Sequence, residues 1–143
     1  MKVYLSKINE SWIIDRMRKE WYEHNSEVST EKINESDIIW IISPWLWKKL
    51  PKRYLKKNKV VCSVYHFEEK DFERDSLKDF YKRDSYVDEY HVISPYIEKD
   101  LRNLTTKPIT YIPFWVNESI WFNIPDKSNL RKKYNIDEES YLI

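Results

Sequence analysis

The most informative absence in this 143-residue sequence is glycine, which does not occur at all. At the ordinary usage of about 7 %, a chain of this length would carry about ten glycines. The Walker phosphate loop and the glycine-rich dinucleotide-binding fingerprint both need glycine at fixed positions, so neither can be formed here. The chain must also build its helix ends and turns from Asn, Asp, Ser and Pro.

Other features are scarce as well. Cys62 is the single cysteine, so no internal disulfide can form, and a reducing, cytoplasmic location is expected. Cys62 lies in an apolar run, where an inert buried thiol is expected. No apolar run approaches the roughly 20 residues of a membrane span, and Met1–Leu5 meets polar residues too soon for a signal peptide. The net charge of +1 gives no general reason to expect nucleic acid.

Short apolar segments alternate with segments of helical periodicity along the chain. This alternation predicts an α/β fold with a Rossmann-like, doubly wound parallel sheet. A small edge strand is expected at 27–29, and a helix that opens at Ser76 should turn Leu77, Phe80 and Tyr81 inward. The predicted main strands are residues 2–5, 37–42, 59–65, 87–93 and 109–112.

The strand at 59–65 ends in side chains that can do chemistry. Ligands of open α/β sheets bind beyond the carboxyl ends of the strands, so His66 is a candidate catalytic residue, with Tyr65 and Glu68 as candidate substrate ligands. The alternatives are a histidine satisfied by a structural hydrogen bond and a solvated acidic loop. No metal site is expected, because His66, Glu68 and Glu69 lack a third ligand at regular spacing.

Two helix starts carry further candidates. Ser11, Trp12 and Asp15 open the first helix beside the end of the first strand, where a helix N-terminus can bind an anion or sugar hydroxyls. The alternative is simple capping with a core tryptophan. Ser94 is expected to cap a later helix first and to face a ligand second.

Between the strands at 37–42 and 59–65 lies a run that we call the basic-aromatic patch. Such a patch can dock to an anionic membrane surface, whereas the alternative is a solvated helix face in a lysine-rich chain. No nucleic-acid motif accompanies it, so no nucleic-acid partner is expected. The patch consists of Trp45, Trp47, Lys48, Lys49, Lys52, Arg53, Lys56, Lys57 and Lys59.

The last part of the chain differs in character. Phe114, Trp115, Trp121 and Phe122 are apolar for a link, which predicts packing at a boundary between two domains. We therefore expect an α/β domain at 1–116, a linker at 117–127 and the start of a second domain at 128–143. The helix and strand start in 128–143 have no partner within the chain, which indicates a fragment of a two-domain protein.

Four segments, in this order and spacing, resemble the N-terminal domain of a two-domain, GT-B-type glycosyltransferase of the family 4 group. One opens the first helix, one is the strand that ends in histidine, one is a strand followed by a Ser-capped helix, and one enters the linker. They are Asn9-Glu10-Ser11-Trp12-Ile13-Ile14-Asp15-Arg16, Val60 to His66, Val92-Ile93-Ser94-Pro95-Tyr96-Ile97, and Ile112-Pro113-Phe114-Trp115-Val116-Asn117 with Phe122 after it.

The resemblance implies a hexosyltransferase-like enzyme that moves a sugar from a nucleotide-sugar donor to an acceptor glycan or lipid-linked acceptor. Residues 1–116 would bind the acceptor, and His66 would face the transferred sugar or the acceptor. The second domain would hold most of the donor site, so this chain alone should be inactive, and no cofactor beyond the donor is implied. A non-enzymatic module that docks to a membrane or protein through the basic-aromatic patch is the alternative.

Overall fold

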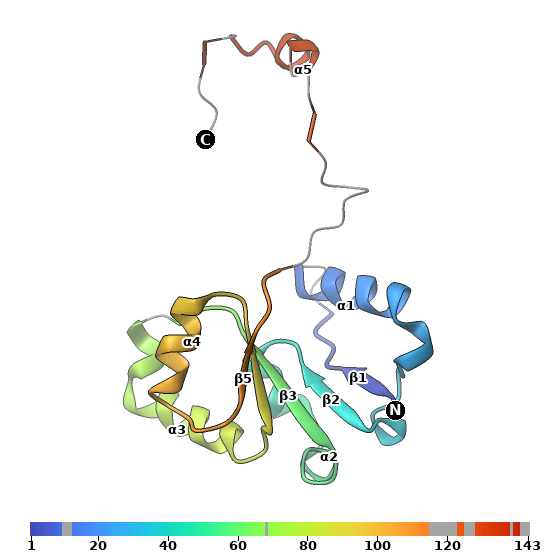
Figure 1. Cartoon of the computed structure of the whole chain (residues 1–143), viewed down its shortest axis with the longest axis vertical. Helices are drawn as coiled ribbons and strands as arrows, with labels where there is room; N and C mark the ends of the chain where they lie inside the picture. Colours follow the sequence, from blue (N-terminus) through green and yellow to red (C-terminus); the bar gives the residue numbers. More distant parts are fainter. Residues whose placement is uncertain (10–12, 68, 115–122, 125–127, 138, 141–143) are drawn as a thin grey trace. The chain divides into compact units, whose positions relative to one another are not determined.

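The computed structural model describes residues 1–9, 13–67, 69–114, 123–124, 128–137 and 139–140, and within them it contains one five-stranded parallel sheet (Figure 1). The strand order is β1-β2-β3-β4-β5, and each strand pairs in parallel with the next. The predicted α/β class and all five main strands are confirmed. The strands are β1 (Val3–Leu5), β2 (Ile38–Ile41), β3 (Lys59–Val64), β4 (Glu89–Val92) and β5 (Ile109–Tyr111).

Helices connect the strands. The predicted edge strand at 27–29 is reduced to a bridge at Ser29, because Ser26–Val28 forms a 3-10 turn. The α-helices are α1 (Ile13–His24), α2 (Lys52–Leu55), α3 (Arg74–Asp84), α4 (Pro95–Arg102) and α5 (Ser128–Lys133). The 3-10 helices are η1 (Ser26–Val28), η2 (Ile33–Glu35), η3 (Pro44–Lys49) and η4 (Glu69–Phe72).

The direction of winding reverses at β1. Ser29 bridges Val3 in parallel, and the Thr30 N–H donates to the Val3 carbonyl at 3.0 Å, on the edge of β1 that β2 does not occupy. The chain therefore crosses through α1 to one side of β1, whereas β2 to β5 are added on the other side. Since crossovers in parallel sheets are right-handed, α1 covers one face and α3 and α4 cover the opposite face, as Figure 1 shows. The sheet is doubly wound, as predicted.

The strand register identifies what each face presents. Cys62 pairs with Ile41 and Tyr90, and its neighbour Val61 pairs with Trp40, so Trp40 and Tyr90 point to opposite faces. Trp21 of α1 packs edge-to-face on Trp40 with ring centroids 5.1 Å apart. On the other side, Phe80 of α3 stacks on Tyr90 at 6.1 Å. We call these the α1 face and the α3 face.

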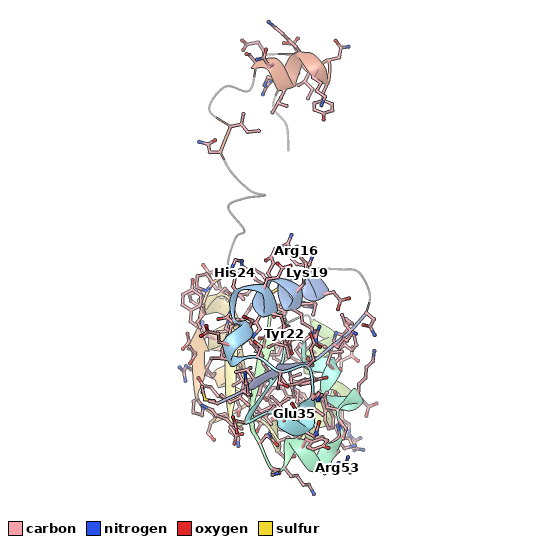
Figure 2. The ribbon with its side chains drawn as sticks, turned by 90° about the vertical axis from the view of Figure 1, so that its right-hand side faces the viewer. Arg16, Lys19, Tyr22, His24, Glu35 and Arg53 are labelled. Carbon is pink, nitrogen blue, oxygen red and sulfur yellow. The ribbon has the colours of Figure 1, made fainter. Side chains whose placement is uncertain are left out.

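Hydrogen bonds through Tyr22 hold α1 to the edge of the sheet. The Leu5 N–H donates to the Tyr22 hydroxyl at 3.3 Å, and that hydroxyl donates to the Thr30 carbonyl at 2.8 Å. In Figure 2 Tyr22 lies between α1 and the sheet, while Arg16 and Lys19 point outward from the same helix. Tyr22 thereby links α1 to β1 and to the segment that follows the Ser29 bridge.

One predicted helix face is wrong. In α3 the side chains of Phe80 and Arg83 are 4 % and 7 % exposed, whereas Tyr81, predicted to face inward, is 53 % exposed. Residues three apart share one side of a helix, and a residue one position on lies about 100° round the axis. Once Phe80 packs on the sheet, Arg83 is carried inward and Tyr81 outward. The helix also begins at Arg74, two residues before the predicted Ser76.

Asparagine takes the place of glycine at left-handed positions, as the composition predicted. Asn9 has φ 64° and Asn135 has φ 54°. At the end of α5 the Ile136 N–H donates to the Arg131 carbonyl and the Asn135 N–H to the Lys132 carbonyl, which is a Schellman cap with Asn135 in the left-handed position.

The chain divides into two compact units, Met1–Pro113 and Phe114–Ile143. The first unit contains the whole sheet, with α1 to α4, and the second contains α5. Among the described residues no helix combines the length and the apolar character that crossing a bilayer requires.

Candidate functional site

A pocket of about 510 Å³ lies at the carboxyl ends of β2 and β3, on the side of the sheet covered by α3. Open parallel sheets bind ligands at this edge. We call it the β2–β3 pocket. Its walls come from the segment after β2, from the segment after β3 and from the inner side of α3. The lining residues are Ser43, Pro44, Trp45, Lys48, Val64, Tyr65, His66, Phe67, Asp71, Asp75, Ser76, Asp79, Phe80 and Arg83.

His66 lies two residues beyond the end of β3, is exposed, and lines the β2–β3 pocket. The strand run Lys59–Val64 is apolar and β-branched, so it is buried in the sheet and carries the polar residues that follow to its carboxyl edge. The position that the sequence singled out is thus on the wall of a cavity. A histidine there can hydrogen-bond a ligand hydroxyl or exchange a proton with it.

Tyr65 lines the same pocket and directly follows β3. Burial raises the pKa of the Tyr65 phenol to about 12. The ring packs edge-to-face on His91 with centroids 6.4 Å apart. Tyr65 is therefore a neutral phenol across the physiological pH range.

Asp79 is held by the basic-aromatic patch. Its carboxylate pairs with the Lys48 ammonium at 2.9 Å and accepts a hydrogen bond from the Trp47 indole N–H at 3.4 Å. The Lys52 ammonium lies 3.9 Å from the centroid of the Trp47 ring and donates to the Trp47 carbonyl. Burial lowers the pKa of Lys52. Trp47, Lys48 and Lys52 of the patch thus make contacts within the fold, beside the pocket.

The remaining cations of the patch lie closer to solvent. Lys49 lies 4.9 Å from the centroid of the Trp45 ring, Trp45 is 40 % exposed, and Arg53 lies over Tyr54 at 4.8 Å. Lys56 and Lys57 are exposed. Because Lys48 and Lys52 contact neighbouring groups of the protein, fewer cations are available to a lipid surface than the sequence indicates. Membrane docking through the patch stays a prediction.

Arg83 is the pocket residue that sequence reasoning missed. It is 7 % exposed, its guanidinium lies 5.0 Å from the centroid of the Phe80 ring, and its Nε has no hydrogen-bond partner among the described residues. The available signal was the three-residue spacing from Phe80, which places both residues on one side of α3. The pocket therefore combines a buried cation with exposed polar groups.

Carboxylates also line the pocket, at Asp71, Asp75 and Asp79. In the part of the chain that the structure describes, no three His, Cys, Asp or Glu residues are grouped so as to hold a metal ion. Carboxylates, a histidine and an exposed tryptophan are groups that bind hydroxyl-rich ligands, since carboxylates accept hydrogen bonds from hydroxyls and aromatic rings pack on apolar faces.

Other predicted site residues lie elsewhere. Asp15 accepts a hydrogen bond from the Asn9 N–H at 3.2 Å, and Ser94 caps α4 by accepting from the Ile97 N–H at 3.3 Å. Neither lines the β2–β3 pocket. Phe114 is 42 % exposed and begins the second unit. The predicted residues Ser11, Trp12, Glu68, Trp115, Trp121 and Phe122 lie outside the described residues.

A buried polar chain crosses the α1 face. The Trp40 indole N–H donates to the Ser63 hydroxyl at 2.8 Å, and the same hydroxyl lies 2.8 Å from His91 Nδ1. His91 Nε2 lies 2.9 Å from the Ile112 carbonyl, which can only accept, so Nε2 carries the proton and Nδ1 accepts from Ser63. His91 is 6 % exposed and is held by these hydrogen bonds within the fold.

Comparisons of the chain with protein-family models, with curated proteins and with solved structures found no match in any of the three. The resemblance to glycosyltransferases therefore stays a prediction.

Proposed function

We propose that this chain is the acceptor-binding domain of a glycosyltransferase and that the β2–β3 pocket receives the acceptor. The observation that carries the proposal is the position of His66, which follows a central strand and lines a pocket of about 510 Å³ at the carboxyl edge of the sheet. Ligands of doubly wound sheets bind at that edge. The order of segments that resembles family 4 enzymes adds the reaction class.

The chemistry of sugar transfer fits the side chains that line this pocket. An acceptor hydroxyl would form the new bond to the anomeric carbon of the donor sugar, the bond from that carbon to the donor phosphate would break with its electron pair leaving on the phosphate, and the hydroxyl proton would pass to His66. His66 would hydrogen-bond the sugar or acceptor hydroxyls during this step. Asp75 and the exposed ring of Trp45 would position the acceptor at the mouth of the pocket.

The proposal assigns the nucleotide of the donor mainly to a second domain. The chain has no glycine from which to form a glycine-rich phosphate loop. The 143-residue chain should therefore bind UDP-glucose or GDP-mannose only weakly in calorimetric titration. Micromolar binding of either nucleotide sugar to this chain would overturn this division between the domains.

The decisive variant is His66→Ala in a polypeptide that carries both domains. Loss of a group that acts in proton transfer reduces turnover about 10²–10⁴-fold. Because His66 is exposed, the midpoint of urea unfolding should change little. The matched control is His24→Ala, which removes an exposed histidine from α1 and should change neither quantity. Sugar transfer by His66→Ala at the wild-type rate would contradict the proposal.

A further inference from the structure

The guanidinium of Arg83, at the floor of the β2–β3 pocket, takes no part in the proposed sugar transfer. The floor is defined by burial: Val64, Phe80 and Arg83 are buried, whereas Trp45, His66 and Asp75 at the rim are exposed. A guanidinium keeps its proton at every pH at which a protein is folded, so this position stays positively charged. A buried charge is costly unless it is paired and hydrogen-bonded.

The two carboxylates that flank Arg83 on α3 are bound by other groups. Asp79, one turn before it, accepts from Lys48 and Trp47. Asp84, which follows it, accepts from the Tyr90 hydroxyl at 3.0 Å and from the Thr105 hydroxyl at 2.7 Å.

Among the described residues no carboxylate lies within 4.0 Å of the Arg83 guanidinium, and Nε lacks a hydrogen-bond partner. The side chain contacts the ring of Phe80 instead, at 5.0 Å. The fold thus brings a cation to the floor of the pocket and gives the Asp79 and Asp84 carboxylates other partners. A buried polar group left in this state requires a partner outside the described part of the protein.

We propose that the ligand of the β2–β3 pocket carries an oxyanion, a phosphate or a carboxylate, which the Arg83 guanidinium binds at the pocket floor. The planar fork of a guanidinium matches both groups and can donate two parallel hydrogen bonds to them. A neutral hydroxyl could accept one such bond but would leave the charge unneutralised. At a floor shielded from water, charge complementarity has a larger effect than at the surface.

The rim indicates what the rest of the ligand is. Asp75 and His66 offer hydrogen-bonding groups near solvent, and Trp45 offers an exposed ring. The charge of Asp79 is matched by Lys48, so the charge nearest the floor is that of Arg83. These groups fit a hydroxyl-bearing body with one acidic group, such as a sugar phosphate or a sugar acid. That this ligand is the acceptor rests on the proposed function; its binding at Arg83 does not.

The test is calorimetric titration of the 143-residue chain at fixed ionic strength with four probes: inorganic phosphate, glucose 1-phosphate, glucuronate and glucose. At least one of the two acidic sugars should bind about tenfold or more tightly than glucose, because hydrogen bonds to a charged group are worth more than neutral ones. Tighter binding of glucose 1-phosphate identifies the oxyanion as phosphate, and tighter binding of glucuronate identifies it as carboxylate. Equal binding of charged and neutral sugars, or no binding by any probe, overturns the proposal.

Two variants locate the site. Arg83→Met should fold with unchanged or higher stability, since it removes an unpaired buried charge, and it should lose the tenfold preference for the acidic sugar. Lys82→Met removes the same charge from the exposed side of the same helical turn and should keep that preference. If Arg83→Met is much less stable than Lys82→Met, Arg83 is structural and the proposal fails.

A third variant, Arg83→Lys, tests the geometry of the guanidinium because it keeps the charge and loses the planar fork. It should weaken acidic-sugar binding without abolishing it; full loss or full retention would contradict the fork geometry.

None of these measurements uses sugar transfer, so the two hypotheses can fail separately. If His66→Ala keeps full transfer activity while Arg83 variants lose acidic-sugar binding, the proposed function fails and the anion site stands. If His66→Ala loses transfer while Arg83→Met binds the acidic sugars as the wild type does, the anion site fails and the proposed function stands.

Discussion

On the α3 face the central strands contribute Ile41, Cys62 and Tyr90, and on the α1 face the neighbouring positions contribute Trp40, Ser63 and His91. Ile41, Cys62 and Tyr90 are all 0 % exposed and pack in the apolar core. Trp40, Ser63 and His91 are joined by hydrogen bonds instead. The same strands therefore present an apolar row to one helix layer and, to the other, a row joined by hydrogen bonds on which the Trp21 ring packs.

This difference predicts how the stability of the fold responds to a substitution on each face. Apolar burial is non-directional and depends on the area removed from water. A buried hydrogen-bond chain depends on every member, because removal of one leaves the others unsatisfied in a medium of low dielectric. On the α1 face Trp40, Ser63 and His91 have hydrogen-bond partners within the fold. On the α3 face Arg83 Nε has none among the described residues. That contrast is the reason for assigning Arg83 to a ligand and His91 to the fold.

The largest effect is expected from Leu101→Ala on the α3 face. Leu101 of α4 is 0 % exposed, and truncation of a fully buried leucine costs about 2–5 kcal/mol through lost burial and the cavity that remains. Urea unfolding followed by circular dichroism measures this loss. Leu104→Ala, at a partly buried position just beyond the same helix, is the control and should cost less. Equal losses at both positions would contradict the view that α4 is held by burial at Leu101.

A loss of comparable size is expected from Ser63→Ala on the α1 face. The substitution leaves the Trp40 indole N–H and His91 Nδ1 without their shared partner, which costs about 1–3 kcal/mol per unsatisfied group. The control is Ser85→Ala, an exposed serine whose hydroxyl donates to the Lys82 carbonyl, with a change within about 0.5 kcal/mol. Equilibrium unfolding in urea measures both.

A double-mutant cycle sharpens this comparison. In a Trp40→Phe background the indole N–H is already gone, so Ser63→Ala leaves only His91 Nδ1 unsatisfied and should cost less than it does in the wild type. Additive costs would mean that the three side chains do not act as one chain. The same cycle between Trp40 and Leu101, which lie on opposite faces of the sheet, should be additive.

The main features of the fold were accessible from sequence for identifiable reasons. The segments around Ile39 and Val60 are continuous apolar, β-branched runs, which are typical of strands buried on both faces. Polar residues that follow such a strand must lie at its carboxyl edge, so His66 could be placed at the mouth of a cleft without coordinates. The absence of glycine predicted helix ends built from Asn, Asp, Ser and Pro, and Asn135 ends α5 in the left-handed conformation.

The rest of the site required the three-dimensional structure. Sequence reasoning placed Tyr81 inward because it follows Leu77 by four residues, a helical spacing, whereas the packing of Phe80 on Tyr90 fixed the rotation of α3 and buried Arg83. The bonds that link Lys48 and Trp47 to Asp79 join residues more than thirty positions apart. Likewise, only the register that pairs Ser63 with His91 reveals the chain of hydrogen bonds on the α1 face.

The smallest effect is expected in acid, at Glu89 on the exposed end of the α1 face. Hydrogen bonds from the Thr110 hydroxyl at 2.8 Å and from Lys59 at 3.0 Å hold the pKa of Glu89 below its ordinary value. A carboxyl whose pKa is lower in the folded state stabilises the fold above its ordinary value of about 4.3, and this contribution is lost as the pH falls through the folded pKa. For a partly exposed pair the contribution is about 1 kcal/mol or less.

Thr110→Val removes the largest cause of this shift and retains Lys59. The variant should therefore lose less stability than the wild type between about pH 5 and pH 3, as measured by urea midpoints across that range. Thr106→Val, an exposed threonine in the turn before β5, should keep the wild-type acid profile. If Thr110→Val follows the wild-type profile, the Thr110 bond does not stabilise the Glu89 carboxylate.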